Sequence, residues 1–161
     1  MDALPSLARW FHFMAGIMWV GLLYYFNFVQ MAALKSATAD GSAAAINRHV
    51  VPRALFWFRW AAVATWITGA ALLGGDFIAA FALQRGHLAI GIGAWLGTIM
   101  LINVWALLWP AQKIALGLVE STEAQKNAAR RRGFIVSRLN LALSFPLLFF
   151  MGAAGHTAIF F

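Results

Sequence analysis

Three of the four histidines lie in strongly apolar segments, and imidazole is the side chain here best suited to bind a redox metal. His12 follows the start of the first apolar segment, His87 opens the third, and His156 lies near the end of the fourth, whereas His49 lies in a polar connection. Imidazole nitrogen binds haem iron, copper and zinc. The chain has no cysteine, which excludes disulfides, thiolate metal sites and covalently attached haem c.

The elements that position these histidines are membrane helices. The chain is 63% hydrophobic and only 11% charged, too little polar surface for a soluble domain of 161 residues. A helix needs roughly 20 apolar residues to cross a bilayer. Four segments satisfy this: 7–34, 50–73, 87–109 and 134–158. The sequence therefore predicts an all-α, integral membrane four-helix bundle that forms a single membrane domain over residues 1–161.

The basic residues predict its orientation. Lys and Arg gather in the connections 35–49 and 110–133 and at the adjoining helix ends, whereas the other side holds only Arg9 and Arg85. Cytoplasmic loops carry the Lys/Arg excess. We therefore expect these two connections to be cytoplasmic and both termini to be periplasmic. The net charge of +7 then reflects membrane topology, and we expect no nucleic-acid partner.

Four crossings bring the three apolar-segment histidines to one membrane depth, near the periplasmic face. Bundles build cofactor sites from inward-facing side chains of different helices. We expect a b-type haem whose iron is bound by two of His12, His87 and His156. Copper or zinc would suit three imidazoles as well, and histidines that only pack and hydrogen-bond are the simplest alternative.

Each of these histidines has a glycine one helical turn further inward: Gly16, Gly91 and Gly152. Such glycines would leave room for a flat cofactor against the backbone. The alternative is close helix packing, the use expected of the G-x-x-x-G pair Gly93 and Gly97.

Arg9 and Arg85 each lie within three residues of a histidine. They could pair with the two propionates of a haem, because arginine favours bidentate contacts with carboxylates. The alternative is that both side chains extend to the membrane surface as anchors.

A second polar set lies toward the cytoplasmic side. Arg59, about two turns inside the second helix, requires a partner in the membrane, and we expect Asn27 or Asn103 to supply it. Asn103 and Asn140 lie off the histidine faces of their helices, so we expect them to join helices or to meet a second copy of the chain. Spacing alone identifies no catalytic residue.

Several segments resemble the membrane domain of the bacterial membrane-bound urate oxidase (urate hydroxylase) family. The resemblance covers all four helices and is most specific in "NVWALLWPAQK" and "SFPLLFFM". It implies a multi-pass protein of the bacterial inner membrane, a haem role for His12, His87 and His156, and electron transfer to a cytochrome c. The family joins this domain to a C-terminal cytochrome c domain, but the present chain has no C-x-x-C-H motif, so we expect no haem c in it.

Three functions remain open on these grounds. The first is a membrane redox protein that binds haem b and passes electrons to a cytochrome c or a quinone. The second is an oxidoreductase acting on urate or a porphyrinogen, since a weaker likeness exists to the four-helix protoporphyrinogen oxidases of the haem pathway. The third is a non-catalytic accessory subunit of a larger respiratory or photosynthetic complex. In each case we expect membrane lipid around the helices, and a homodimer or a larger membrane complex.

Overall fold

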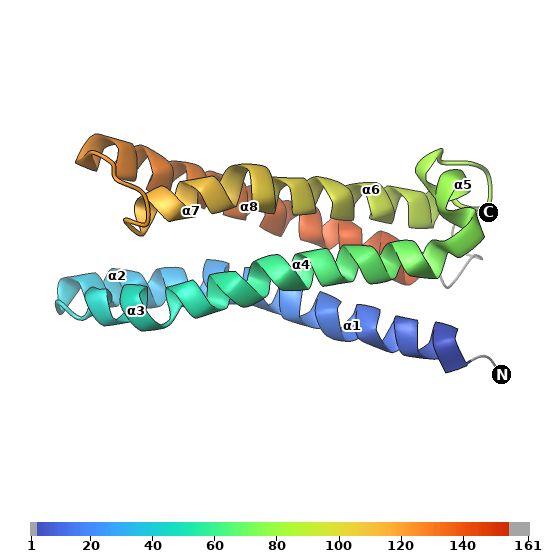
Figure 1. Cartoon of the computed structure of the whole chain (residues 1–161), viewed down its shortest axis with the longest axis horizontal. Helices are drawn as coiled ribbons and strands as arrows, with labels where there is room; N and C mark the ends of the chain where they lie inside the picture. The colour runs from blue at the N-terminus through green and yellow to red at the C-terminus, as the bar shows by residue number, and fades with distance from the viewer. Residues whose placement is uncertain (1–2, 155–161) are drawn as a thin grey trace.

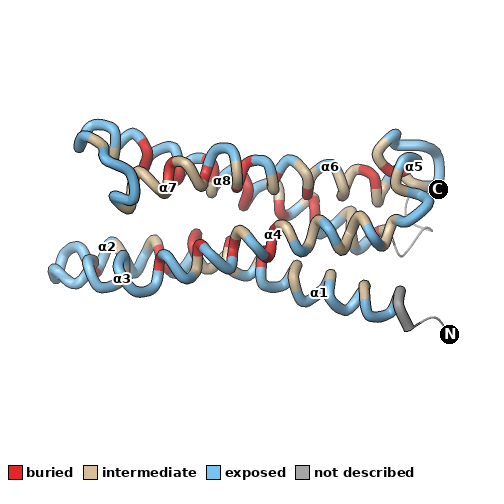
Figure 2. Tube along the Cα trace, viewed as in Figure 1, coloured by how far each residue is buried: buried red, intermediate tan, exposed pale blue. Residues whose placement is uncertain are grey.

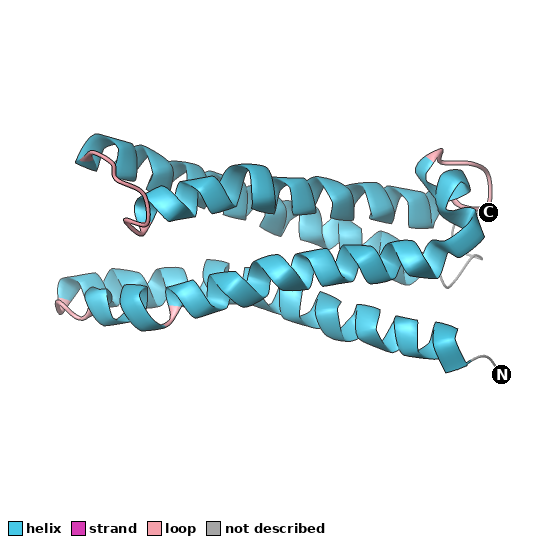
Figure 3. Cartoon of the chain, in the orientation of Figure 1, coloured by secondary structure: helices cyan, strands magenta, loops and turns pink. Residues whose placement is uncertain are grey.

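The computed structural model describes residues 3–154, and that part of the chain is built from helices joined by short turns (Figure 3). The elements in chain order are α1 Ala3–Tyr24, η1 Tyr25–Gln30, α2 Met31–Ala39, α3 Ala43–His49, α4 Val51–Leu73, η2 Gly74–Asp76, α5 Phe77–Phe81, α6 Leu88–Ile102, η3 Asn103–Leu108, α7 Trp109–Ala115 and α8 Glu123–Ala153.

Four continuous helical stretches are long and apolar enough to cross a membrane, which confirms the predicted fold class. They are Ser6–Ala39, Ala43–Phe81, Leu88–Ala115 and Glu123–Ala153. The first has 34 residues, which corresponds to about 50 Å and exceeds the ~30 Å hydrocarbon core. The architecture is that of a multi-pass membrane protein whose helices extend beyond the apolar layer.

The helices are longer than their apolar runs predicted. The first continues through α2 to Ala39, and the fourth begins at Glu123 instead of residue 134. A charged residue ends the apolar run that crosses the membrane, but it does not end the helix. The helix continues because the residues that follow include the good helix formers Ala, Lys, Arg and Gln. The sequence "EAQKNAARRR", expected to lie in the connection 110–133, therefore forms the first turns of α8.

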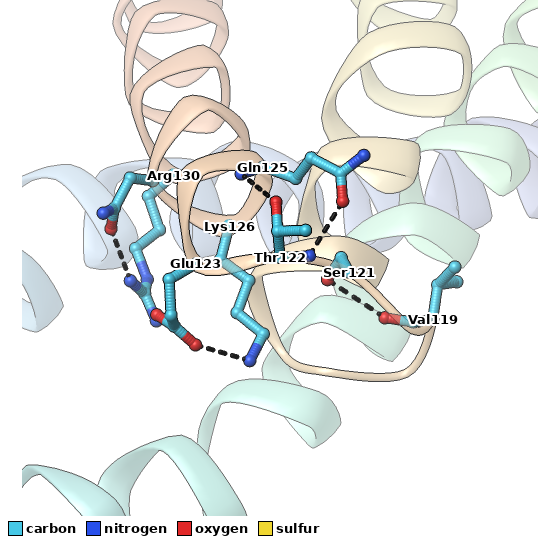
Figure 4. Close-up of polar contacts among 8 residues, drawn as sticks. Val119, Ser121, Thr122, Glu123, Gln125, Lys126 and Arg130 are labelled. Atoms are coloured by element: carbon cyan, nitrogen blue, oxygen red, sulfur yellow. Dashed lines mark hydrogen bonds and ion pairs between the residues drawn. The ribbon is translucent and has the colours of Figure 1, made fainter.

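The start of α8 is fixed by a reciprocal capping arrangement (Figure 4). The Thr122 hydroxyl accepts a hydrogen bond from the Gln125 backbone N–H at 3.3 Å, and the Thr122 backbone N–H donates to the Gln125 side chain at 2.8 Å. Lys126 donates to Glu123 at 2.7 Å in the same turn. The two bonds between Thr122 and Gln125 satisfy backbone N–H groups that have no partner inside the helix.

The four stretches are arranged as two antiparallel pairs (Figure 1). α1 packs most extensively against α4, and α6 and α7 pack against α8. We call the end of the bundle that holds the α2–α3 and α7–α8 connections the basic end, and the opposite end, where α5 lies, the α5 end. The described basic residues of the basic end are Lys35, Arg48, Arg53, Lys113, Lys126, Arg130, Arg131 and Arg132.

Glycines set the distance between α6 and α8. A Cβ on Gly93 would lie 3.0 Å from Met151 Cε, and one on Gly97 would lie 3.7 Å from Leu147 Cδ1. Both glycines are buried. Gly93 of the G-x-x-x-G pair therefore serves close helix packing, whereas a Cβ at Gly97 would make an ordinary contact.

Two short π-helical segments, η1 and η3, interrupt the long helices that contain them. Each carries a buried asparagine, Asn27 in η1 and Asn103 in η3. A π-helical turn holds more residues than an α-helical turn, and such segments recur at functional sites. They lie between the apolar middle of each crossing and the basic end (Figure 1).

Candidate functional site

The imidazole ring of His12, on α1, is held against α4 by a hydrogen bond. Its Nδ1 lies 3.0 Å from the Thr65 carbonyl oxygen and 3.2 Å from Thr68 Oγ1. A carbonyl oxygen can only accept, so Nδ1 carries the proton and donates it. Nε2 then keeps its lone pair, and no described residue bonds to it. A histidine that donates Nδ1–H to a backbone carbonyl is oriented to bind a metal through Nε2.

Gly69 allows the ring to approach α4. A Cβ built on Gly69 would lie 3.0 Å from His12 Cε1 and 3.4 Å from Nδ1. Only glycine gives the ring its present contact without displacement. One face of α4 thus contacts the His12 ring through Thr65, Thr68 and Gly69. The ring is half-buried there.

His87 precedes α6 at the α5 end. Its Nε2 lies 3.6 Å from an Asp76 carboxylate oxygen, a distance too long for a good hydrogen bond. Its Nδ1 is buried without a hydrogen-bond partner among the described residues. An unpaired buried ring nitrogen is costly, so His87 is the second candidate imidazole at the α5 end.

The part of the bundle around His12 has no packed core (Figure 2). No residue of α1 from Ser6 to Met18 is buried, and none of α4 from Val63 to Leu73. The main apolar core lies further toward the basic end and includes Leu23, Phe58 and Val104. At the α5 end the two pairs are joined instead by single contacts such as Trp66 Nε1 donating to Thr98 Oγ1 at 2.8 Å.

Gly91 does not provide the space for a cofactor that the sequence led us to expect. A Cβ on Gly91 would lie 2.1 Å from the Ala80 carbonyl oxygen and 2.8 Å from Leu83 Cδ2. α5 therefore fills the space beside Gly91, and that glycine leaves no room for a cofactor. Gly16 has an ordinary neighbour, Thr65 Cγ2 at 3.8 Å from its would-be Cβ, and the Cβ of an alanine at Gly152 would meet no described neighbour within 4 Å.

The remaining predicted site residues are distributed as follows. Arg9 on α1 and Arg85 in the α5–α6 connection are both exposed, and the described residues include no ion-pair partner for either. His156 lies outside the described residues. Among the described residues, no three His, Asp or Glu side chains come together as a metal site. His12 and His87 lie on elements that share the α5 end, whereas His49 ends α3 at the basic end (Figure 1).

A separate polar layer joins the helices nearer the basic end. Asn103 Nδ2 donates to Asn140 Oδ1 at 2.9 Å, and Asn140 Nδ2 donates to the Met100 carbonyl at 3.1 Å. Asn27 Nδ2 donates to Ser137 Oγ at 2.9 Å. These bonds cross between α8 and the two π-helical segments, so the asparagines join helices within the chain.

Arg59 does not have the amide partner that the sequence led us to expect. Its guanidinium carbon lies 3.2 Å from the centroid of the Trp109 ring and 5.7 Å from that of Trp105. Arg59 Nε has no hydrogen-bond partner among the described residues. The amide groups of Asn27 and Asn103 donate to α8, and that of Asn27 also to its own helix. The arginine is accommodated by stacking on indole rings.

Comparison with known families decides the affiliation of the chain. Residues 76–161, more than half of the chain, match the family model described as urate oxidase N-terminal. The chain belongs to the urate oxidase N-terminal family. No curated protein and no solved structure matches it. The affiliation and the four membrane-length helices confirm the resemblance on which the sequence analysis drew.

The matched range of this urate oxidase N-terminal domain begins at Asp76, so it covers α5, the second helix pair and residues to the end of the chain. It includes His87, Arg85 and His156, but not His12 or Arg59. His12 therefore enters the candidate site on its geometry alone.

Sequence reasoning missed Thr65, Thr68 and Gly69, the residues that orient His12. A signal for them was present in "TWITG", where two hydroxyl side chains and a glycine share one face of a helix. Their partner could not be identified without the helix pairing, because the polar face fits any polar side chain on a neighbouring helix.

Proposed function

We propose that this chain is a membrane redox protein that binds a b-type haem at the α5 end. The observation that carries the proposal is the His12–Thr65 hydrogen bond, which leaves Nε2 as the metal-binding atom. His87, with its unpaired Nδ1, supplies a second imidazole at the same end. His156 is the third candidate from the sequence, and two of the three would hold the iron.

The described residues fit a large flat group in chemistry and in place. Neutral imidazole is a common haem ligand, and no residue of α1 from Ser6 to Met18 is buried, so the helix around His12 is not enclosed by protein. Gly16 and Gly152 border that end without crowding, whereas Gly91 contributes packing only. The exposed guanidinium groups of Arg9 and Arg85 would hold the propionates by charge-assisted hydrogen bonds.

Bound there, a haem would supply reversible one-electron transfer. The protein's own residues would fix its orientation: the Thr65 carbonyl holds the His12 ring, and His87 lies beside Asp76, with 3.6 Å between Nε2 and the nearer carboxylate oxygen. Family affiliation favours a urate-linked reaction. We propose a cytochrome c or a quinone as the electron acceptor. We further propose that the basic end faces the cytoplasm of a bacterial inner membrane, because Lys and Arg concentrate there.

The decisive experiment is a reduced-minus-oxidised spectrum with haem quantified per chain, after expression with haem supplied. We expect a Soret band in the wild type and its loss in His12→Ala and His87→Ala. His49→Ala is the matched control, because His49 is exposed at the opposite end. A colourless protein, or equal haem content in all variants, would contradict the proposal.

Two further measurements refine it. Metal analysis of the same preparation distinguishes haem iron from copper or zinc, which three imidazoles would also suit.

Because the chain has no native cysteine, single cysteines substituted at Ser42 and Gln84 allow the orientation in the membrane to be determined by labelling with an impermeant thiol reagent. We expect Gln84→Cys to react from the periplasmic side and Ser42→Cys only after the membrane is opened.

Catalysis is tested separately. Urate turnover with added cytochrome c as acceptor would establish an oxidoreductase, whereas haem loading without turnover would leave an electron-transfer or accessory subunit. The His49→Ala variant should behave as the wild type in this assay too.

A further inference from the structure

Two cationic side chains of the membrane-length helical stretches flank one indole ring. Arg59 stacks on Trp109 at 3.2 Å from its guanidinium carbon to the ring centroid, and Lys113 Nζ lies 5.8 Å from the same centroid. Arg59 comes from α4 and Lys113 from α7. The cluster therefore lies between the two helix pairs, toward the basic end.

No described carboxylate neutralises this pair. The ion pairs found in the described part of the chain are His87–Asp76 and Lys126–Glu123, and neither involves Arg59 or Lys113. A charged side chain inside a membrane crossing is costly without a partner. Stacking on Trp109 compensates part of the cost of Arg59, because the face of an indole attracts a cation.

Two buried side-chain atoms of this cluster have no partner, and both are donors. Arg59 Nε is buried and has no hydrogen-bond partner, and the same is true of Trp105 Nε1. Arginine and tryptophan side chains offer no acceptor, so these two groups cannot satisfy one another. Trp105 lies beside the cluster, with the Arg59 guanidinium carbon 5.7 Å from its ring centroid and Trp60 packed edge-on at 5.5 Å.

The stacking on Trp109 uses the face of the guanidinium, not its N–H donors. Trp109 covers its face, whereas the N–H groups point outward from the edge in the plane of the group. An oxyanion is recognised at that edge, through two parallel N–H···O bonds. Lysine adds a point charge to such a site, and an indole N–H adds one more donor.

We propose that Arg59, Trp105 and Lys113 form a binding site for an anionic oxygen group, either a phosphate or a carboxylate, at the basic end of the bundle. The bound group accepts hydrogen bonds from Arg59 and from Trp105 Nε1, and its charge offsets both cations. It comes from an acidic phospholipid of the surrounding leaflet or from a soluble anion, and the site lies apart from the histidines.

The test uses the full chain, purified and delipidated in a non-ionic detergent. Thermal unfolding is followed with added phosphatidylglycerol, with phosphatidylcholine, and with inorganic phosphate against chloride at equal ionic strength. We expect phosphatidylglycerol or inorganic phosphate to raise the midpoint of the wild type in a saturable manner. Stabilisation by the lipid alone identifies a headgroup site, and stabilisation by phosphate identifies a soluble anion.

The variants locate the effect. Arg59→Gln and Trp105→Phe should weaken the apparent affinity, by roughly tenfold or more for the charged partner. Arg53→Gln is the matched control, because Arg53 is exposed on the same helix and donates to the His49 carbonyl. If Arg59→Gln does not fold, Trp105→Phe and Arg59→Lys give the answer. The proposal is overturned if neither ligand stabilises the wild type beyond its control, or if the variants and Arg53→Gln respond alike.

Discussion

Asn140 of α8 bridges two positions of the third crossing that lie three residues apart: it accepts a hydrogen bond from Asn103 at 2.9 Å and donates to the Met100 carbonyl at 3.1 Å. Asn140 is completely buried, with 0% of its surface exposed. A fully satisfied amide pair in an apolar interface fixes the register of the two helices, because any slip would leave both amides unpaired.

The first prediction concerns this amide pair. Asn103→Ala and Asn140→Ala should each lower the free energy of unfolding by about 1–3 kcal/mol, because each leaves a buried polar partner unsatisfied. The double variant should lose less than the sum, with a coupling of about 0.6 kcal/mol or more. The free energy of unfolding of the wild type, the two single variants and the double variant is measured in mixed micelles. Asn47→Ala, at an exposed position of α3, is the control, and strict additivity would show that the pair contributes no joint stabilisation.

The second prediction concerns the contact between the His12 ring and α4. Gly69→Ala places a methyl group 3.0 Å from His12 Cε1, so the ring must move and its bond to the Thr65 carbonyl should lengthen. NMR of the imidazole nitrogens should show a changed Nδ1–H signal. In haem-loaded protein, the midpoint potential should change as well, because the ligand's second hydrogen bond tunes its basicity.

Gly21→Ala is the control for that substitution. Gly21 is exposed on α1, and a Cβ there would meet nothing within 4 Å. We expect unchanged imidazole signals and a gain of stability of up to ~1 kcal/mol, the usual difference between Gly and Ala in a helix. Identical imidazole spectra for Gly69→Ala and wild type would mean that the glycine does not control the ring.

The third prediction concerns the junction between α5 and α6. Gly91→Ala would place a Cβ 2.1 Å from the Ala80 carbonyl oxygen, which belongs to the backbone and cannot rotate away. The substitution should cost about 1–3 kcal/mol or more. Gly97→Ala, whose Cβ would lie 3.7 Å from Leu147 Cδ1, should be tolerated. Equal midpoints of unfolding for the two variants would show that α5 can move away from residue 91 at little cost.

The fourth prediction concerns the first turn of α8. Thr122→Ala removes the acceptor for the Gln125 N–H. It should lower the stability of that turn by about 1 kcal/mol, the usual cost of losing a threonine cap. Hydrogen exchange at residues 124–126 should become faster. Ser121→Ala, which loses only a hydroxyl that donates to the Val119 carbonyl, should leave those rates unchanged.

The fold class could be predicted from the sequence because it depends on length and polarity alone. Apolar runs of bilayer length require helices, since no other open structure satisfies its backbone in lipid. The helix ends could not be predicted in this way. Ala39 and Glu123 lie beyond the apolar runs, where helix propensity and the Thr122 cap determine the boundary.

The candidate site was predictable in part. Four crossings place His12 and His87 on elements that share one end, but periodicity does not tell which neighbour a helix face meets. Gly91 illustrates this: it was expected to face a cofactor, and it faces α5 because the α5–α6 connection folds back over it. Arg59 illustrates it again, since an aromatic ring on α7 was a less obvious partner than an amide.

The π-helical segment Tyr25–Gln30 has a consequence for relatives of different length. A π-helical turn arises when one residue is inserted into an α-helix without a shift of the flanking turns. A relative that lacks one residue here could therefore close into a regular α-helix with His12 still seated on α4. Its Asn27 would be lost or rotated away from Ser137. Alignments across this segment should accordingly place a gap within it rather than in a loop.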